Sequence, residues 1–68
     1  MTKEGVFWVF CIEMYRVSKR MTGKQVIELF KHYGVSEYLI SCYEALHTTG
    51  QQYIVEDIDL FIESRQSA

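Results

Sequence analysis

A chain of 68 residues is long enough for one small domain, and we expect a single domain over residues 1–68. Hydrophobic residues make up 49% of the chain and aromatic residues 15%, with no proline and a formal net charge of −2. So much apolar material is difficult to bury inside so short a chain. We therefore expect a surface that binds another protein or a second copy of the chain, which would form a homodimer.

The same composition argues against a membrane protein and against a secreted disulfide-rich domain. The apolar run over residues 6–12 is shorter than the roughly 20 residues of a membrane span, and it lacks the layout of a signal peptide. The two cysteines, Cys11 and Cys42, are fewer than the roughly four that a secreted framework of this size carries. We expect free thiols and a cytoplasmic protein.

Residues 5–12 are rich in aromatic and β-branched side chains, which also suit a buried strand. However, no second strand-like segment is present to pair with them, and nothing breaks the chain between Ile12 and Met21. The sequence therefore favours one long helix over residues 3–20. Its spacing predicts a core stripe of Phe7, Phe10, Cys11, Met14 and Val17. A second stripe, which we expect to be the contact surface, contains Trp8, Ile12 and Tyr15.

A second helix is predicted over residues 22–33. Thr22 followed by Gln25 matches the capping box, in which each side chain accepts a hydrogen bond from the other residue's backbone N–H. Gly34 is expected to end the helix in the left-handed conformation, with Val35 making the accompanying apolar contact.

Two more helices complete an all-α, four-helix prediction. Ser36 is the expected N-cap of a helix over residues 37–47, which ends at Thr48, Thr49 and Gly50. We expect a positive φ at Gly50. After a short apolar run at residues 53–55, the acidic residues Glu56 and Asp57 predict the first turn of a last helix that reaches about Arg65.

The sequence contains no pattern that indicates catalysis, a cofactor or a metal ion. Zinc needs three or four ligands held together, and the only imidazoles, His32 and His47, have no such set around them. Thr48 and Thr49 beside His47 are typical of a helix end rather than of an activated nucleophile. We therefore predict that the protein is not an enzyme and binds no cofactor.

The charges are divided between the two halves of the chain. Residues 1–35 carry a net charge of +3 and residues 36–68 carry −5. The acidic candidates for an interaction are Asp57, Asp59 and Glu63, together with Glu56. A basic group at the junction of the first two helices (Arg16, Lys19, Arg20 and Lys24) leaves a nucleic-acid-binding regulator as the alternative function. The expected reading helix, however, presents acidic side chains and no basic one, which argues against DNA binding.

Three segments carry a resemblance to a known family: EMYR, TGKQVIELFKHYGV and YEALHTTGQQYIVEDIDLFI. Together they cover nearly the whole chain, which resembles the bacterial domain-of-unknown-function family numbered 3791. The resemblance implies a companion of proteins similar to ADP-ribosyltransferase toxins, with an accessory or antitoxin-like role. It implies no catalytic residues. We expect the acidic last helix to face a basic groove of such an enzyme or the basic junction of a second copy.

Overall fold

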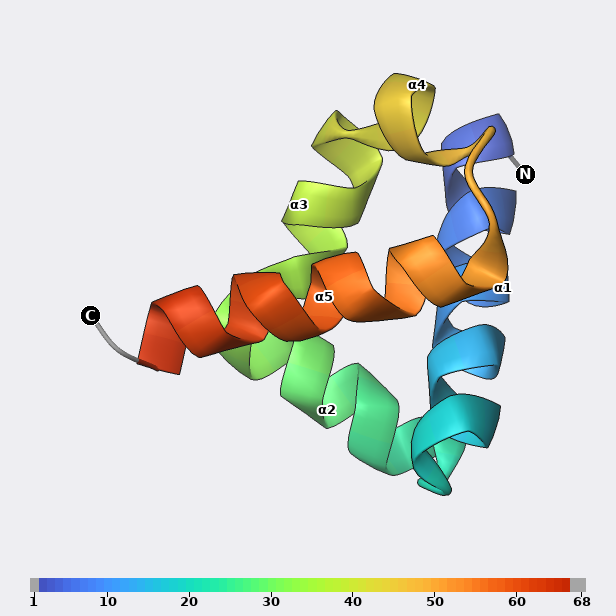
Figure 1. Ribbon diagram of the computed structural model, residues 1–68. Coiled ribbons are helices and arrows are strands. Elements are labelled where there is room, and N and C mark those ends of the chain that lie inside the picture. Colours follow the sequence, from blue (N-terminus) through green and yellow to red (C-terminus); the bar gives the residue numbers. More distant parts are fainter. Residues whose placement is uncertain (1, 67–68) are drawn as a thin grey trace.

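The computed structural model describes residues 2–66, and these residues contain five α-helices and no strand (Figure 1). The helices are α1 Lys3–Lys19, α2 Gly23–Tyr33, α3 Val35–Ser41, α4 Tyr43–Leu46 and α5 Gln51–Gln66. The all-α class is therefore confirmed. Four of the helices have seven residues or more, while the short α4 is the second part of the helix expected over residues 37–47.

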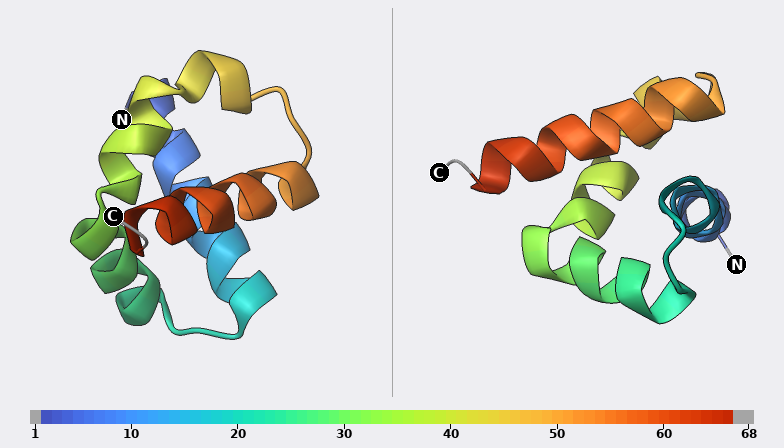
Figure 2. Two further views of the ribbon diagram at one scale, coloured as in Figure 1. Left: turned by 60° about the vertical axis from the view of Figure 1, so that its left-hand side comes forward. Right: turned by 60° about the horizontal axis from the view of Figure 1, so that its bottom comes forward.

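The first three long helices surround the core, and α5 closes it. α1, α2 and α3 pack against one another, and α5 crosses them with contacts to α1 and α3 (Figure 1). In the right-hand view of Figure 2, α1 is seen nearly end-on beside α2, with α5 passing over both α1 and α3. The largest fully buried side chains come from all of these helices: Phe30, Leu39, Ile54, Ile58, Val26, Val35 and Cys11.

The N-terminal segment is helical, as the sequence favoured, and the strand interpretation is wrong. Thr2 caps α1 by accepting a hydrogen bond from the Gly5 backbone N–H at 3.0 Å. The helix ends at Arg20, which has a φ of 57°. This left-handed conformation costs a non-glycine residue roughly 1–2 kcal/mol, and it lets the Arg20 N–H bond back to the carbonyls of the last turn.

The prediction for α2 is confirmed at both ends. Thr22 and Gln25 form the reciprocal capping box, with hydrogen bonds of 2.9 and 3.1 Å. Gly34 has a φ of 72°, and its N–H bonds to the Phe30 carbonyl. Val35 follows fully buried. The tight turn at Gly34 therefore anchors the start of α3 in the core.

The predicted start and continuity of the third helix are wrong. α3 begins at Val35 directly after Gly34 without a side-chain cap, so Ser36 is not an N-cap. The Ser36 hydroxyl instead accepts a hydrogen bond from the Trp8 indole N–H at 2.7 Å. At Cys42 the backbone leaves helical geometry, with φ −100° and ψ 14°. The resulting bend directs α4 toward the start of α1, where the ring of Tyr43 packs edge-on against Phe7 at 5.3 Å.

The last helix begins five residues earlier than the acidic residues indicated. The Gly50 carbonyl accepts the first helical hydrogen bond from the Ile54 N–H at 3.1 Å, so α5 starts at Gln51. Ile54, Ile58 and Ile62 follow at four-residue intervals and are all buried. This apolar periodicity extends the helix backwards. The acidic side chains therefore lie in its middle turns and do not form its first turn.

The positive φ predicted for Gly50 is also wrong. Within residues 2–66, only Arg20 and Gly34 have a positive φ. The turn after α4 is closed by Thr49, whose backbone N–H and side-chain hydroxyl both bond to the Leu46 carbonyl, at 3.0 and 2.7 Å. The hydrogen bonds of Thr49 to the Leu46 carbonyl therefore close this turn, and no positive φ at Gly50 is needed.

The two turn glycines provide a matched test. Gly34→Ser should lower the free energy of unfolding by about 1–2 kcal/mol, because serine is strained at a φ of 72°. Gly50→Ser should leave it unchanged or raise it, because a Cβ there meets no atom within 4 Å and serine is a favourable N-cap. Urea unfolding followed by far-UV circular dichroism measures both values. Equal losses at the two positions would contradict this account of the turns.

Candidate interaction surface

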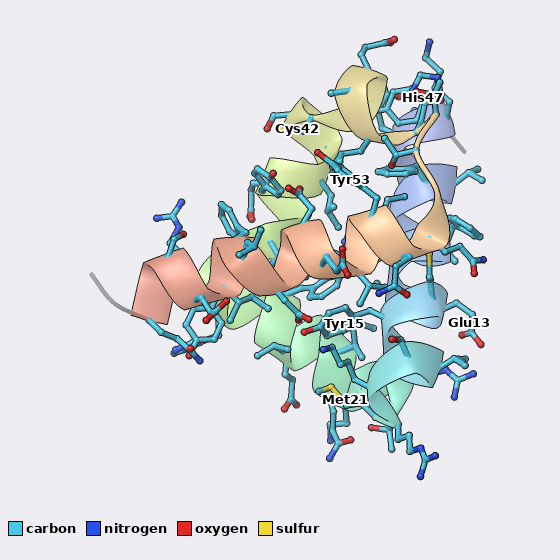
Figure 3. All side chains as sticks on the ribbon, in the orientation of Figure 1. Glu13, Tyr15, Met21, Cys42, His47 and Tyr53 are labelled. Atoms are coloured by element: carbon cyan, nitrogen blue, oxygen red, sulfur yellow. The ribbon has the colours of Figure 1, made fainter. Side chains whose placement is uncertain are left out.

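The stripe expected to be the contact surface lies inside the fold. Ile12 and Tyr15 are only 8% and 4% exposed, and Trp8 is half-buried against the core. Figure 3 shows Tyr15 pointing inward from α1. The predicted location is therefore wrong. The polar tips of Trp8 and Tyr15 find hydrogen-bond partners on other helices, which allows these aromatic side chains to be buried.

Asp59 links α5 to α1. Its carboxylate accepts a hydrogen bond from the Tyr15 hydroxyl at 2.6 Å and one from the Lys19 ammonium at 2.6 Å. The Tyr15 ring also packs against Phe30 of α2 at 5.4 Å. Burial of the ring and its hydrogen bond to Asp59 raise the pKa of Tyr15 well above the ordinary value for tyrosine. Asp59, a candidate interaction residue, is thus part of the internal packing.

Asp57 has a similar position between α5 and α3. It accepts a hydrogen bond from the Tyr38 hydroxyl at 2.6 Å, and the Tyr38 ring stacks on Phe61 at 4.2 Å. The hydrogen bond and the burial of the ring raise the pKa of Tyr38. Glu63 lies exposed near the end of α5, and Glu56 is exposed one helical turn after Gln52, from which it accepts a 2.9 Å hydrogen bond. Glu56 and Glu63 therefore form the acidic outer part of α5.

Among the helices described, the opposite side of α1 carries the largest group of exposed apolar side chains. Val6, Val9, Phe10 and Val17 are between 46% and 62% exposed. With Glu13 they form what we call the outer face of α1, and Figure 3 shows Glu13 pointing away from the rest of the chain. Phe10 and Val17 had been assigned to the core stripe. The signal that could have corrected this is Glu13, because it lies three residues after Phe10 and four before Val17 and so shares their side of the helix.

Two hollows adjoin the outer face of α1. The first, of about 320 Å³, lies between α1 and the start of α5, and Phe10, Glu13, Val17, Gln52 and Val55 are among its lining residues. We call it the α1–α5 hollow. The second, of about 440 Å³, lies toward α4 and is lined by Lys3, Val6, Phe7, Phe10, Tyr43 and His47. Phe10 lines both hollows, so its half-exposed phenyl ring lies at the centre of a continuous apolar surface.

Ion pairs neutralise half of the basic group at the junction of α1 and α2. Arg16 pairs with Glu13 through two hydrogen bonds, and this partner holds the pKa of the Glu13 carboxyl below its usual value. Lys19 is held by Asp59. Arg20 and Lys24 are exposed. The junction is therefore less basic than the sequence count indicates.

The remaining chemically notable side chains are dispersed. Across residues 2–66, no group of three or more His, Cys, Asp or Glu side chains is gathered closely enough to hold a metal ion. The His47 ring stacks on Tyr43 at 4.4 Å, and His32 packs against Tyr33 at 4.6 Å. Both cysteines are free thiols, Cys11 buried and Cys42 half-buried. None of the helices described is both long and apolar enough to cross a membrane.

The sequence model of the family described as "Protein of unknown function (DUF3791)" matches residues 6–65. The chain belongs to this family. The match extends from the outer face of α1 to the last turn of α5, so it includes the whole lining of the first hollow and both tyrosine–aspartate pairs. The resemblance stated from the three sequence segments is confirmed as to the family. No curated protein and no solved structure matches the chain significantly.

We predict that Asp59 stabilises the fold. Asp59→Ala should lower the free energy of unfolding by about 1–3 kcal/mol, because it leaves the buried Tyr15 hydroxyl without its acceptor. Tyr15→Phe should lower the free energy of unfolding by less, because it removes the hydroxyl donor itself and leaves no buried polar group unpaired on Tyr15. Glu28→Ala, at an exposed position on α2, is the control and should change stability by less than about 0.5 kcal/mol. Thermal and urea unfolding measure the three values, and an Asp59→Ala chain as stable as the parent would contradict the assignment.

Stability should also fall at alkaline pH. Burial raises the pKa of the Cys11 thiol from 9.0 to about 12, and Tyr15 is shifted upward from 10.0. Both groups are neutral when protonated, and the fold favours this neutral form. Their contribution to stability is therefore fully present at pH values below the pKa that each group has in the unfolded chain. That contribution is lost as the pH rises above about 9 toward the folded pKa values. Urea unfolding between pH 7 and 11 should show the decline, and Cys11→Ala with Tyr15→Phe should make it shallower. If the free energy of unfolding of the double variant declines with pH as steeply as that of the parent, Cys11 and Tyr15 are not the cause of the decline.

Proposed function

We propose that this chain is a non-catalytic protein-interaction module that binds its partner through the outer face of α1. The observation that supports this most strongly is the set of four half-exposed apolar side chains on one side of a single helix, with a hollow at each end. Contiguous apolar surface of this kind, rimmed by polar groups, is characteristic of protein-binding sites. Phe10 is the natural anchor, because an aromatic side chain between two hollows buries a large area upon contact.

The partner that we propose is an ADP-ribosyltransferase-like protein in the same cytoplasm, toward which the chain acts as an accessory or antitoxin-like subunit. This step is supported by the family resemblance. An enzyme that binds a dinucleotide needs basic side chains around the phosphates, and the exposed acidic residues Glu56 and Glu63 suit such a surface. Asp57 and Asp59 are bound to tyrosines of their own chain. The apolar face therefore supplies the affinity in this proposal, while Glu56 and Glu63 steer association.

A nucleic-acid-binding role has less support. Two of the four basic residues at the helix junction, Arg16 and Lys19, are held by carboxylates. Phosphate contacts by Lys and Arg supply most nucleic-acid affinity, so a basic group of which half is already paired with carboxylates is unfavourable.

A catalytic role also has less support, because the buried Cys11 thiol, with its pKa raised to about 12, is a poor nucleophile.

Calorimetric titration of the chain with an ADP-ribosyltransferase-like protein encoded beside it tests the proposal. Phe10→Asp should weaken binding by at least tenfold, because it places a charge where an apolar anchor is buried. Ile27→Asp is the matched control, since Ile27 is 44% exposed against 46% for Phe10 but lies on α2. Loss of transferase toxicity on co-expression would establish the antitoxin form of the role. If the parent does not bind, or if both variants bind like the parent, the proposal fails.

A further inference from the structure

We infer that a second copy of this chain also covers the outer face of α1, in a two-fold dimer whose α1 helices run antiparallel. Phe10 of each copy enters the α1–α5 hollow of the other. The inference rests on the proposed function only in using the same face. In solution the dimer would then compete with the partner protein, so that only the monomer is ready to bind it.

The first argument is that the face is complementary to itself. A two-fold interface brings the same patch of both copies together, so a protruding group and the cavity that receives it must lie on one patch. Here the half-exposed Phe10 ring lies at the edge of the 320 Å³ α1–α5 hollow. That volume is comparable to the smaller pockets that enclose ligands, and it has room for an aromatic ring. Each copy therefore offers both an anchor and a receptor.

The second argument is the register of the apolar residues along α1. An antiparallel pairing whose axis passes between positions 11 and 12 brings Val6 of one copy opposite Val17 of the other. In the same register Phe10 lies opposite Glu13, beside Met14 and Val17, which line the hollow. A parallel pairing brings Phe10 opposite the second Phe10 and leaves both hollows unfilled. Antiparallel helices also place opposite ends of their dipoles together.

The charge of Glu13 does not oppose this arrangement. Arg16 of the same chain binds the Glu13 carboxylate through two hydrogen bonds, so the pair enters the interface neutralised. Both residues keep part of their side chains exposed, 37% for Arg16 and 62% for Glu13. Gln52 at the margin of the hollow provides a further polar group for the rim. An apolar centre with a satisfied polar rim is the usual anatomy of a protein interface.

The available surface is sufficient for a weak dimer. A standard interface covers about 800 Å² on each partner, which is roughly one-sixth of the 4626 Å² surface of this chain. α1 alone, with 17 residues, is about 25 Å long, and the two hollows widen the strip that it presents. We expect an interface at the small end of the specific range, with a dissociation constant on the order of 10 μM.

Sedimentation equilibrium of the full chain between 1 and 500 μM tests the inference. The parent should pass from monomer to dimer across this range. Phe10→Asp should raise the dissociation constant at least tenfold, and so should Val17→Asp, at the more exposed position. Ile27→Asp should leave it unchanged, and circular dichroism confirms that each variant is folded. A parent that is monomeric at 500 μM, or a dimer that both outer-face variants preserve, overturns the inference.

Cross-linking tests the direction of the helices. In a Cys42→Ser background, a mixture of Val6→Cys and Val17→Cys chains should form a disulfide-linked pair under mild oxidation faster than either variant alone. Faster linkage of Val6→Cys chains to each other would indicate parallel helices and overturn the proposed register. These outcomes are independent of the partner protein. A monomer that binds the transferase-like protein refutes only the dimer, and a dimer that does not bind it refutes only the proposed function.

Discussion

The hydrogen bond between the Tyr15 hydroxyl and Asp59 joins residues that are 44 positions apart and holds the inward side of α1 against α5. Both sides of this helix carry apolar side chains, and only the outer side also carries the charged residue Glu13. The side with Trp8 and Tyr15 has polar tips that reach Ser36 and Asp59, whereas the side with Phe10 and Val17 has none. Burying the first side satisfies these groups and leaves the second exposed. The outer face of α1 is thus a consequence of how the core is completed.

The size of the chain explains why such a face remains. A domain of 68 residues hides only about 60% of the surface of its unfolded chain. α2, α3 and α5 cover one side of α1, and within residues 2–66 no helix packs on the other side. About half of the large exposed apolar side chains therefore lie together on one side of α1. In the proposed function, stability and binding share this helix, since its inner side packs in the core while its outer side would contact the partner.

The acidic second half of the chain has two roles that sequence alone did not separate. Asp57 and Asp59 lie on the side of α5 that meets α3 and α1, where each carboxylate accepts a hydrogen bond from a tyrosine hydroxyl. Glu56 and Glu63 are exposed on the same helix. Glu56 and Glu63 add to the outward electrostatic character of the chain, while Asp57 and Asp59 link α5 to helices that are distant in sequence.

Local signals in the sequence determined the helical class, the extent of α1 and the capped ends of α2. A capping box and a glycine stop act within a few residues, so their chemistry can be read without the rest of the fold. The periodicity of Ile54, Ile58 and Ile62 also indicates the early start of α5, whereas the acidic residues Glu56 and Asp57 point to a start that is too late. Glu13 already marks the outward side of α1 in the sequence, whereas tertiary structure alone decided the bend at Cys42 and the pairing of Tyr15 with Asp59. Each of these depends on contacts between distant segments, and the free energy of such contacts exceeds the small local preferences that a sequence pattern expresses.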